Sequence, residues 1–146
     1  GSNRRSLARL RAGGYEGLES RMADPAWAPD FGPARFNPGF GASAIGSRGI
    51  LIAYNVNLAD PDPAVARRIA ADIRESGTEG KPGLFKACRA IGWRIESRGC
   101  SQVSTNLTDF RVTPPHRVHE ACVRLAAEAG TSVTGSEIVG LAPLEA

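Results

Sequence analysis

Cysteine and aromatic residues are scarce in this 146-residue sequence, which holds three cysteines and 6% aromatic side chains. An odd number of widely spaced cysteines predicts neither a disulfide framework nor a zinc site, so we expect small buried thiols in a reducing compartment, the cytoplasm. No apolar run approaches the roughly 20 residues that a membrane helix needs. We therefore expect no membrane partner.

Most of the chain also lacks an excess of charge of either sign. The formal net charge of +3 arises among residues 1–22, where five arginines outnumber two glutamates, and basic and acidic side chains are equal in number beyond them. Nucleic-acid-binding surfaces need clustered Lys and Arg, and RNA recognition on a sheet needs exposed aromatic residues on the central strands. The sheet face predicted below carries no such aromatics, so we expect no nucleic-acid partner.

Glycine and proline are plentiful in the first third of the chain. Residues 1–2, Gly-Ser, resemble a cloning scar, and the abrupt basic start suggests a piece of a longer polypeptide. Residues 3–30 predict a short helical lead, broken at Gly13-Gly14. Residues 23–49 hold four prolines and five glycines, which exclude regular helix and central strand. A structureless loop of this length is usually functional or a linker.

The remaining residues predict the order strand, helix, strand, strand, helix, strand. Alternating apolar runs indicate strands, and apolar residues every three to four positions indicate helices. Strands are expected over residues 50–58, 88–97 and 101–110 and near Val133, and helices over residues 62–77 and 113–130. The fold class is therefore α+β: a ferredoxin-like βαββαβ two-layer sandwich, with a four-stranded antiparallel sheet and both helices on one face.

In this topology the first and third strands are central neighbours, so polar positions on the two should meet. The apolar side of residues 50–58 is expected to face the helices. The other side then forms a cleft face of Asn55, Asn57, Gln102, Ser104 and Asn106. Such a face is either ordinary solvated sheet or a ligand surface. Its richness in amides, which are poor strand formers, favours a flat heterocycle or the exposed edge of a partner as ligand.

No catalytic or metal centre is recognisable from spacing. His116 and His119 lie three residues apart on the second helix, but no third ligand has suitable spacing, so we predict no metal site. Asp30, Asp109 and Glu137 are candidate acids or bases, yet nothing pairs them with a nucleophile. The residues by themselves predict a ligand-binding half-site.

Six separated segments add a family resemblance: RAGGYEGL, WAPDFGP, NPGFGASAIGSRGILIAYNVNL, AIGW, QVSTNLTDF and SEIVGLAPLEA. From about Arg5 to the end, the chain closely resembles the glutamate formiminotransferase family, the transferase part of formimidoyltransferase-cyclodeaminase. The resemblance implies transfer of a formimino group from N-formimino-L-glutamate to tetrahydrofolate, giving 5-formiminotetrahydrofolate and L-glutamate in histidine degradation. It also implies two α/β halves whose sheets face each other with folate between them.

The same resemblance implies where the ligand is held. Residues 3–30 would be the end of the N-terminal subdomain and residues 31–146 the C-terminal subdomain. Folate contacts fall on the loop Gly32, Pro33, Ala34, Arg35, Phe36, Asn37, Pro38, Gly39, Phe40 and Gly41. The family's catalytic histidine belongs to a His-Pro-Arg-Met-Gly-type motif with no counterpart in this chain, so no catalytic residue is assigned. The isolated chain is expected to be inactive or nearly so.

The expected partners follow from this resemblance. Tetrahydrofolate is the expected co-substrate, with no metal, and the partners are folate, N-formimino-L-glutamate and the N-terminal subdomain. The sequence leaves a homodimer open. By charge, Arg35 or Arg48 suits the anionic glutamate tail of folate, although a surface arginine needs no ligand. The alternative function is a protein-binding or assembly module that docks a partner subdomain through its polar sheet face.

Overall fold

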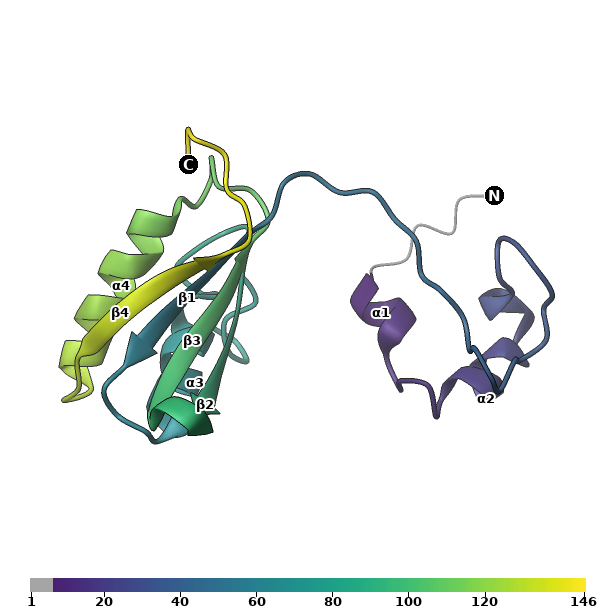
Figure 1. The fold of residues 1–146 in the computed structure, drawn as a ribbon, viewed down its shortest axis with the longest axis horizontal. Coiled ribbons are helices and arrows are strands. Elements are labelled where there is room, and N and C mark those ends of the chain that lie inside the picture. Colours follow the sequence, from purple (N-terminus) through teal and green to yellow (C-terminus); the bar gives the residue numbers. More distant parts are fainter. Residues whose placement is uncertain (1–6) are drawn as a thin grey trace. The chain divides into compact units, whose positions relative to one another are not determined.

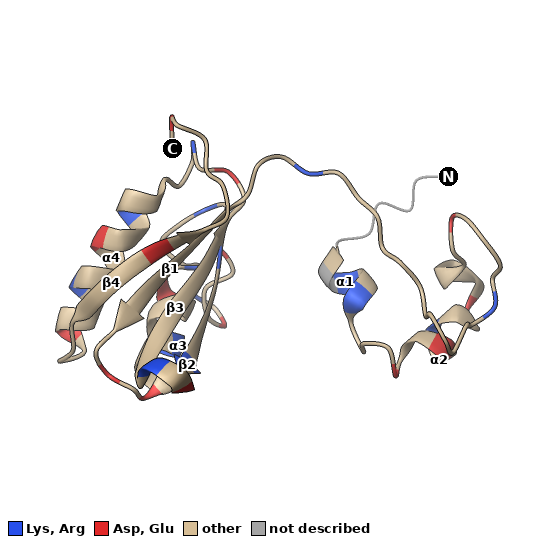
Figure 2. Ribbon diagram, in the orientation of Figure 1, with Lys and Arg blue, Asp and Glu red and all other residues tan. Residues whose placement is uncertain are grey.

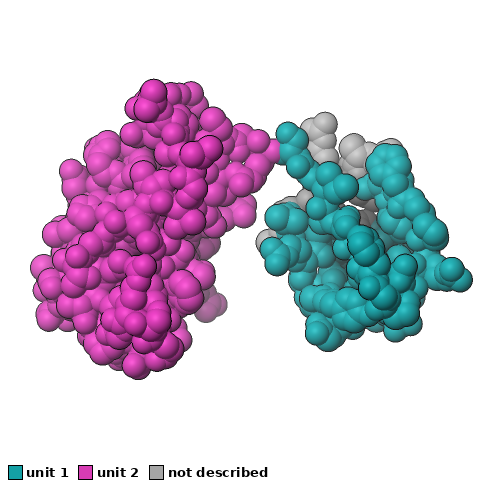
Figure 3. Space-filling view, viewed as in Figure 1, with its two compact units in different colours: residues 1–47 teal, residues 48–146 magenta. Residues whose placement is uncertain are grey.

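A computed structural model describes residues 7–146, and its chain divides into two compact units, residues 1–47 and residues 48–146 (Figures 1 and 3). The expected cloning scar at residues 1–2 lies outside the described residues. The loop at residues 31–47 belongs to the first unit, whereas the sequence-based division grouped it with the later residues. Within residues 7–146, no helix is both long enough and apolar enough to cross a membrane.

The first unit is organised around one arginine rather than around a core. It contains α1 (Leu7–Arg11), α2 (Leu18–Met22) and the 3₁₀ turn η1 (Pro25–Trp27), so the predicted short helical lead is confirmed. The Arg21 guanidinium donates to the carbonyl oxygens of Leu10 at 3.1 Å, Gly14 at 3.3 Å and Gly17 at 3.2 Å. It also lies 5.1 Å from the ring centroid of Trp27. Because no described side chain of this unit is fully buried, these charge-assisted bonds and ring contacts hold it together.

The second unit is the predicted ferredoxin-like sandwich. Its elements are β1 (Ile52–Leu58), α3 (Pro63–Ile73), β2 (Cys88–Ile95), the 3₁₀ turn η2 (Glu96–Arg98), β3 (Cys100–Leu107), α4 (Pro115–Glu128) and β4 (Val133–Val139). All neighbouring strands are antiparallel, in the order β2-β3-β1-β4. Both long helices cover the same side of the sheet, as Figure 1 shows.

The core lies between the sheet and the two helices. Ile52, Val56 and Leu58 of β1 are fully buried and pack with Ile69 of α3 and Val118 of α4. The apolar spacing along both helices therefore predicts correctly which side of each helix is buried. The Asp62 side chain accepts a hydrogen bond from the Ala64 backbone N–H at 2.9 Å and so forms the N-cap of α3.

Several element boundaries differ from the expected ones; α3, for example, ends at Ile73 rather than at residue 77. Strand β1 begins at Ile52, because Ile50 lies outside the ladder and is exposed. Helix α4 begins at Pro115, since the Thr113 hydroxyl donates to the Lys86 carbonyl at 2.6 Å instead of capping the helix. The hairpin between β2 and β3 turns through η2, and Gly99 closes it at φ 60°.

Gly92 is required where α3 packs on β2. A Cβ atom at this position would collide with the backbone of Ala66 and Arg67. We expect Gly92→Ala to lower the free energy of unfolding by about 3 kcal/mol, the upper range for overpacking, because backbone cannot move aside as a side chain can. The measurement is urea unfolding. Gly135→Ala is the matched control, since a Cβ there meets nothing within 4 Å. Equal stability of the two variants would contradict this packing.

Buried thiols make stability fall in alkali. Burial, with a smaller contribution from Cys88, raises the pKa of Cys122 to about 12. The unfolded thiol ionises near pH 9, so stability is intact below that pH and declines by about 1.4 kcal/mol per pH unit up to the native pKa. Cys122→Ala should remove this part of the decline. The free energy of unfolding, measured from pH 8 to pH 10.5, tests this. If the free energy of unfolding fell with pH as steeply in the variant, the decline would not come from the Cys122 thiol.

Candidate functional site

The sheet face turned away from α3 and α4, called the open face below, gathers the predicted amides. Strand register places Asn55 opposite Ser104, Asn57 opposite Gln102, and Ala53 opposite Asn106. The five predicted cleft-face residues therefore do lie on one face, as expected. Their role in binding a ligand stays a prediction.

Gln102 is the centre of this face, and it is 1% exposed although no helix covers it. Its Oε1 accepts from Trp93 Nε1 at 3.0 Å. Its Nε2 donates to Asn57 Oδ1 at 2.8 Å and to Glu137 Oε1 at 3.1 Å. One side chain thus joins β2, β3, β1 and β4 across the whole width of the sheet. We call Asn55, Asn57, Trp93, Gln102 and Glu137 the amide network.

Glu137 is the acidic end of the amide network. Its Oε1 accepts from Asn55 Nδ2 at 3.3 Å as well as from Gln102. Its Oε2 lies 3.8 Å from the Arg98 guanidinium, a half-exposed pair that contributes little to stability. Figure 2 shows this acidic position on β4, on a strand otherwise without charge. The carboxylate is therefore held in place but still open to a ligand.

Sequence reasoning missed two members of the amide network. Trp93 lies on an edge strand, outside the two central strands that carry the predicted amides, although alternation along residues 88–97 puts it beside Gln102. Glu137 is only a candidate acid in the sequence, because a strand is expected near Val133 and the structure extends it to Val139. Ser104 and Asn106 share the face but make no side-chain hydrogen bond in the structure. Trp93 and Ile91 leave exposed apolar surface along the β2 side.

The predicted folate loop, residues 32–41, is anchored on Tyr15. The Tyr15 hydroxyl donates to the Pro38 carbonyl at 2.6 Å, and its ring lies 5.5 Å from that of Phe36. Asn37 forms the turn, because its Oδ1 accepts from the backbone N–H groups of Gly39 at 2.9 Å and Phe40 at 3.2 Å. The Phe36 ring thus packs against Tyr15, whereas the Phe40 ring is 76% exposed to solvent.

The remaining candidate residues are exposed or bonded to nearby backbone. Arg35 is exposed, and Arg48 donates to the Gly49 carbonyl at 3.3 Å. Asp30 is exposed, and Asp109 Oδ1 accepts from the Arg111 backbone N–H at 3.1 Å, so this carboxylate closes a turn. Within each of the two units, neither carboxylate is paired with a nucleophile among the described residues.

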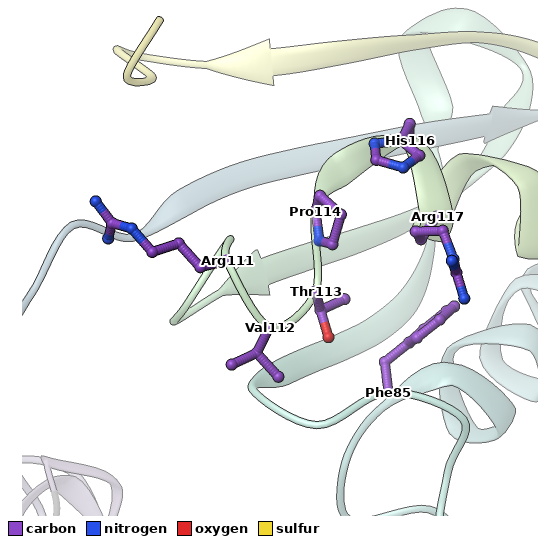
Figure 4. A pocket seen from close by; sticks show the side chains of 7 residues that line it. All are labelled: Phe85, Arg111, Val112, Thr113, Pro114, His116 and Arg117. Carbon is purple, nitrogen blue, oxygen red and sulfur yellow. The ribbon is translucent and has the colours of Figure 1, made fainter. Parts of the chain in front are cut away.

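The two histidines lie in different environments. The His119 Nδ1 lies 3.0 Å from the Tyr54 hydroxyl, and burial raises the pKa of that tyrosine. His116 instead lies on a shallow pocket of about 310 Å³ lined by Phe85, Arg111, Val112, Thr113, Pro114, His116 and Arg117 (Figure 4). Arg111 extends away from this lining and pairs with Glu145 at 3.5 Å. Among residues 7–146, no three His, Cys, Asp or Glu side chains are grouped so as to hold a metal ion.

Comparison with known proteins gives matches along the whole chain. The family model described as the formiminotransferase domain matches residues 53–146, and that of its N-terminal subdomain matches residues 1–48. Formimidoyltransferase-cyclodeaminase of Dictyostelium discoideum is 47% identical over 146 residues, which cover 99% of this chain and 27% of that protein. The Sus scrofa protein of the same name has the same identity and coverage.

A shorter relative matches in the same way. Glutamate formimidoyltransferase of Streptococcus pyogenes serotype M1 is 39% identical over 143 residues, which cover 98% of this chain and 46% of that protein. The chain therefore spans less than half the length of each of these curated relatives.

The buried amide of Gln102 should be costly to remove. Gln102→Leu leaves Trp93 Nε1 and Asn57 Oδ1 without their partner, so we expect the free energy of unfolding to fall by about 1–3 kcal/mol. Ser104→Ala on the same face should change it by less than about 0.5 kcal/mol. Urea unfolding followed by circular dichroism measures both. A neutral Gln102→Leu variant would show that the amide network adds no stability.

Proposed function

The chain belongs to the formiminotransferase domain family, and from that premise we propose that it supplies the tetrahydrofolate-binding C-terminal part of a glutamate formimidoyltransferase. The proposed reaction moves a formimino group from N-formimino-L-glutamate to tetrahydrofolate, as in histidine degradation in the cytoplasm. The observation that carries the proposal is the match of two formiminotransferase models to consecutive segments of one chain. The helical lead at residues 3–30 would then close the N-terminal subdomain, and the sandwich would be the core of the C-terminal one.

The geometry of the loop supports a folate site. A flat ligand needs backbone that approaches closely and aromatic faces that lie exposed. Gly32 and Gly41 adopt φ of 86° and 73°, a conformation that residues with a Cβ avoid. Phe40, next to Gly41 in the chain, is exposed, while Tyr15 and Asn37 hold the loop through their hydrogen bonds without any ligand. Less conformational entropy is then lost on binding.

The reaction needs two proton transfers that these residues do not perform. The N5 amine of tetrahydrofolate attacks the formimino carbon, and the bond from that carbon to the glutamate nitrogen breaks. N5 must lose a proton, and the departing nitrogen must gain one. We assign both transfers to the N-terminal subdomain. This chain contributes binding and orientation, which lower the entropic part of the barrier.

A protein-binding or assembly module is the second function. In that case the open face would dock a partner subdomain and have no role toward folate, and a homodimer is one arrangement it would allow. The family match favours the transferase. An Asn55→Ala, Gln102→Ala double variant separates the two, because an assembly module would lose subdomain association while folate affinity in the assembled protein stayed unchanged.

Two exposed phenylalanines allow a matched test of the loop. Phe31 and Phe40 are 94% and 76% exposed, but only Phe40 lies in residues 32–41. We expect Phe40→Ala to weaken 5-formyltetrahydrofolate binding up to about tenfold, the effect of losing a ring contact worth up to about 1.4 kcal/mol. Phe31→Ala should leave the affinity unchanged. Isothermal titration calorimetry measures both, with an N-terminal formiminotransferase subdomain supplied.

Two results would contradict the proposal. Absence of saturable heat with 5-formyltetrahydrofolate, even with the N-terminal subdomain present, would remove folate binding. Equal losses in the Phe31 and Phe40 variants would move the ligand away from the loop.

A further inference from the structure

Tyr15 holds the backbone of the loop at two places, one on each side of Phe40. Its hydroxyl donates to the Pro38 carbonyl at 2.6 Å. Its ring packs against Gly41, where a Cβ atom would come within 3.4 Å of the ring carbon Cδ2. Phe40 lies between Pro38 and Gly41 in the chain. The backbone that carries the Phe40 ring is therefore fixed on both sides by one side chain.

The turn between these two points leaves Phe40 little conformational freedom. The Asn37 Oδ1 accepts from the Phe40 backbone N–H at 3.2 Å, and the Asn37 carbonyl accepts from the Gly41 N–H at 2.7 Å. The Phe40 side chain itself is 76% exposed, so its backbone is held while its ring stays open to solvent. A ring held in this way loses less conformational entropy when a ligand packs against it.

Tyr15 is in turn held by Arg21. The Arg21 guanidinium donates to the carbonyls of Gly14 at 3.3 Å and Gly17 at 3.2 Å, which flank Tyr15 in the turn between α1 and α2. The Tyr15 side chain is 51% exposed, so little of its ring belongs to a core. Its contacts therefore determine the shape of the loop more than the stability of the unit.

We propose that Tyr15 is a positioning residue for tetrahydrofolate binding and acts through Phe40, an inference that rests on the proposed function. The hydroxyl bond to Pro38 keeps the Phe40 ring where its face meets the ligand. Without that bond the loop adopts more conformations, and the fraction of chains competent to bind falls, which lowers the affinity by the same factor. In this role Tyr15 contacts neither the substrates nor the reacting atoms, so the chemical step in the bound complex is unchanged.

The test combines Tyr15→Phe with Phe40→Ala. Tyr15→Phe keeps the ring beside Phe36 and Gly41 and removes only the hydroxyl bond to Pro38. Loss of a hydrogen bond worth about 1 kcal/mol should raise the dissociation constant of 5-formyltetrahydrofolate about fivefold. In the Phe40→Ala background the same change should raise it by less than about twofold, because the two residues act as one unit. Calorimetry with the N-terminal subdomain present measures the unsubstituted chain, both single variants and the double variant.

Kinetics give a second readout that a general loss of structure would not produce. With the N-terminal subdomain supplied, Tyr15→Phe should raise the KM for tetrahydrofolate about fivefold and leave kcat and the KM for N-formimino-L-glutamate unchanged. Tyr54→Phe is the matched control, because it also removes one tyrosine hydroxyl bond, the one of 3.0 Å to His119 on the helix side of the sheet. The control should bind and react as the unsubstituted chain does.

The outcomes separate this inference from the proposed function. If Phe40→Ala weakens binding and Tyr15→Phe does not, folate binding at the loop stands and the inference fails. A loss that keeps its full size in the Phe40→Ala background, or a fall in kcat, shows that Tyr15 acts in another way and also overturns the inference. If Phe40→Ala leaves the affinity unchanged, the inference fails while folate binding stands. If the unsubstituted chain does not bind 5-formyltetrahydrofolate, both fail.

Discussion

Val56 lies opposite Val103 and Asn57 opposite Gln102 in the ladder between β1 and β3, and the rest of the second unit depends on this register. Side chains of a strand alternate between the two faces, so a slip of one residue would turn the amides toward the helices and the valines toward solvent. The present register buries Val56 and Val103 completely. The same pairing brings the Gln102 amide to Asn57. One alignment therefore produces both the core and the candidate site.

The sandwich could be predicted from the sequence because its signals are local and repeated. Apolar spacing in α3 and alternation in β1 each indicate the correct element, and the order of elements leaves few topologies. The boundaries were harder, since they depend on contacts distant in sequence. Thr113 resembles a helix cap, but the Lys86 carbonyl takes its hydroxyl. No local pattern reports a bond across 27 residues.

The candidate site, like the fold, could be predicted from the sequence only in part. Its location on the open face followed from alternation and strand order, which require only backbone geometry. The direction of its hydrogen bonds could not be predicted from the sequence. Glu137 comes from the last strand and Trp93 from an edge strand, and both reach Gln102 only through side-chain conformations. The loop posed a different difficulty. Its glycines and prolines predicted irregular backbone, but the Tyr15 hydroxyl on Pro38 joins residues 23 positions apart.

The indole of Trp93 also bears on how this surface could evolve. The orientation of the Gln102 amide is fixed from both sides, because the indole can only donate and the Glu137 carboxylate can only accept. Replacing the indole with a side chain that only accepts a hydrogen bond would place that acceptor against the Gln102 carbonyl oxygen, while Glu137 would still hold the amino group on its own side. The edge strand therefore tolerates a donor at this position far better than an acceptor, although the position lies outside the central pair of strands.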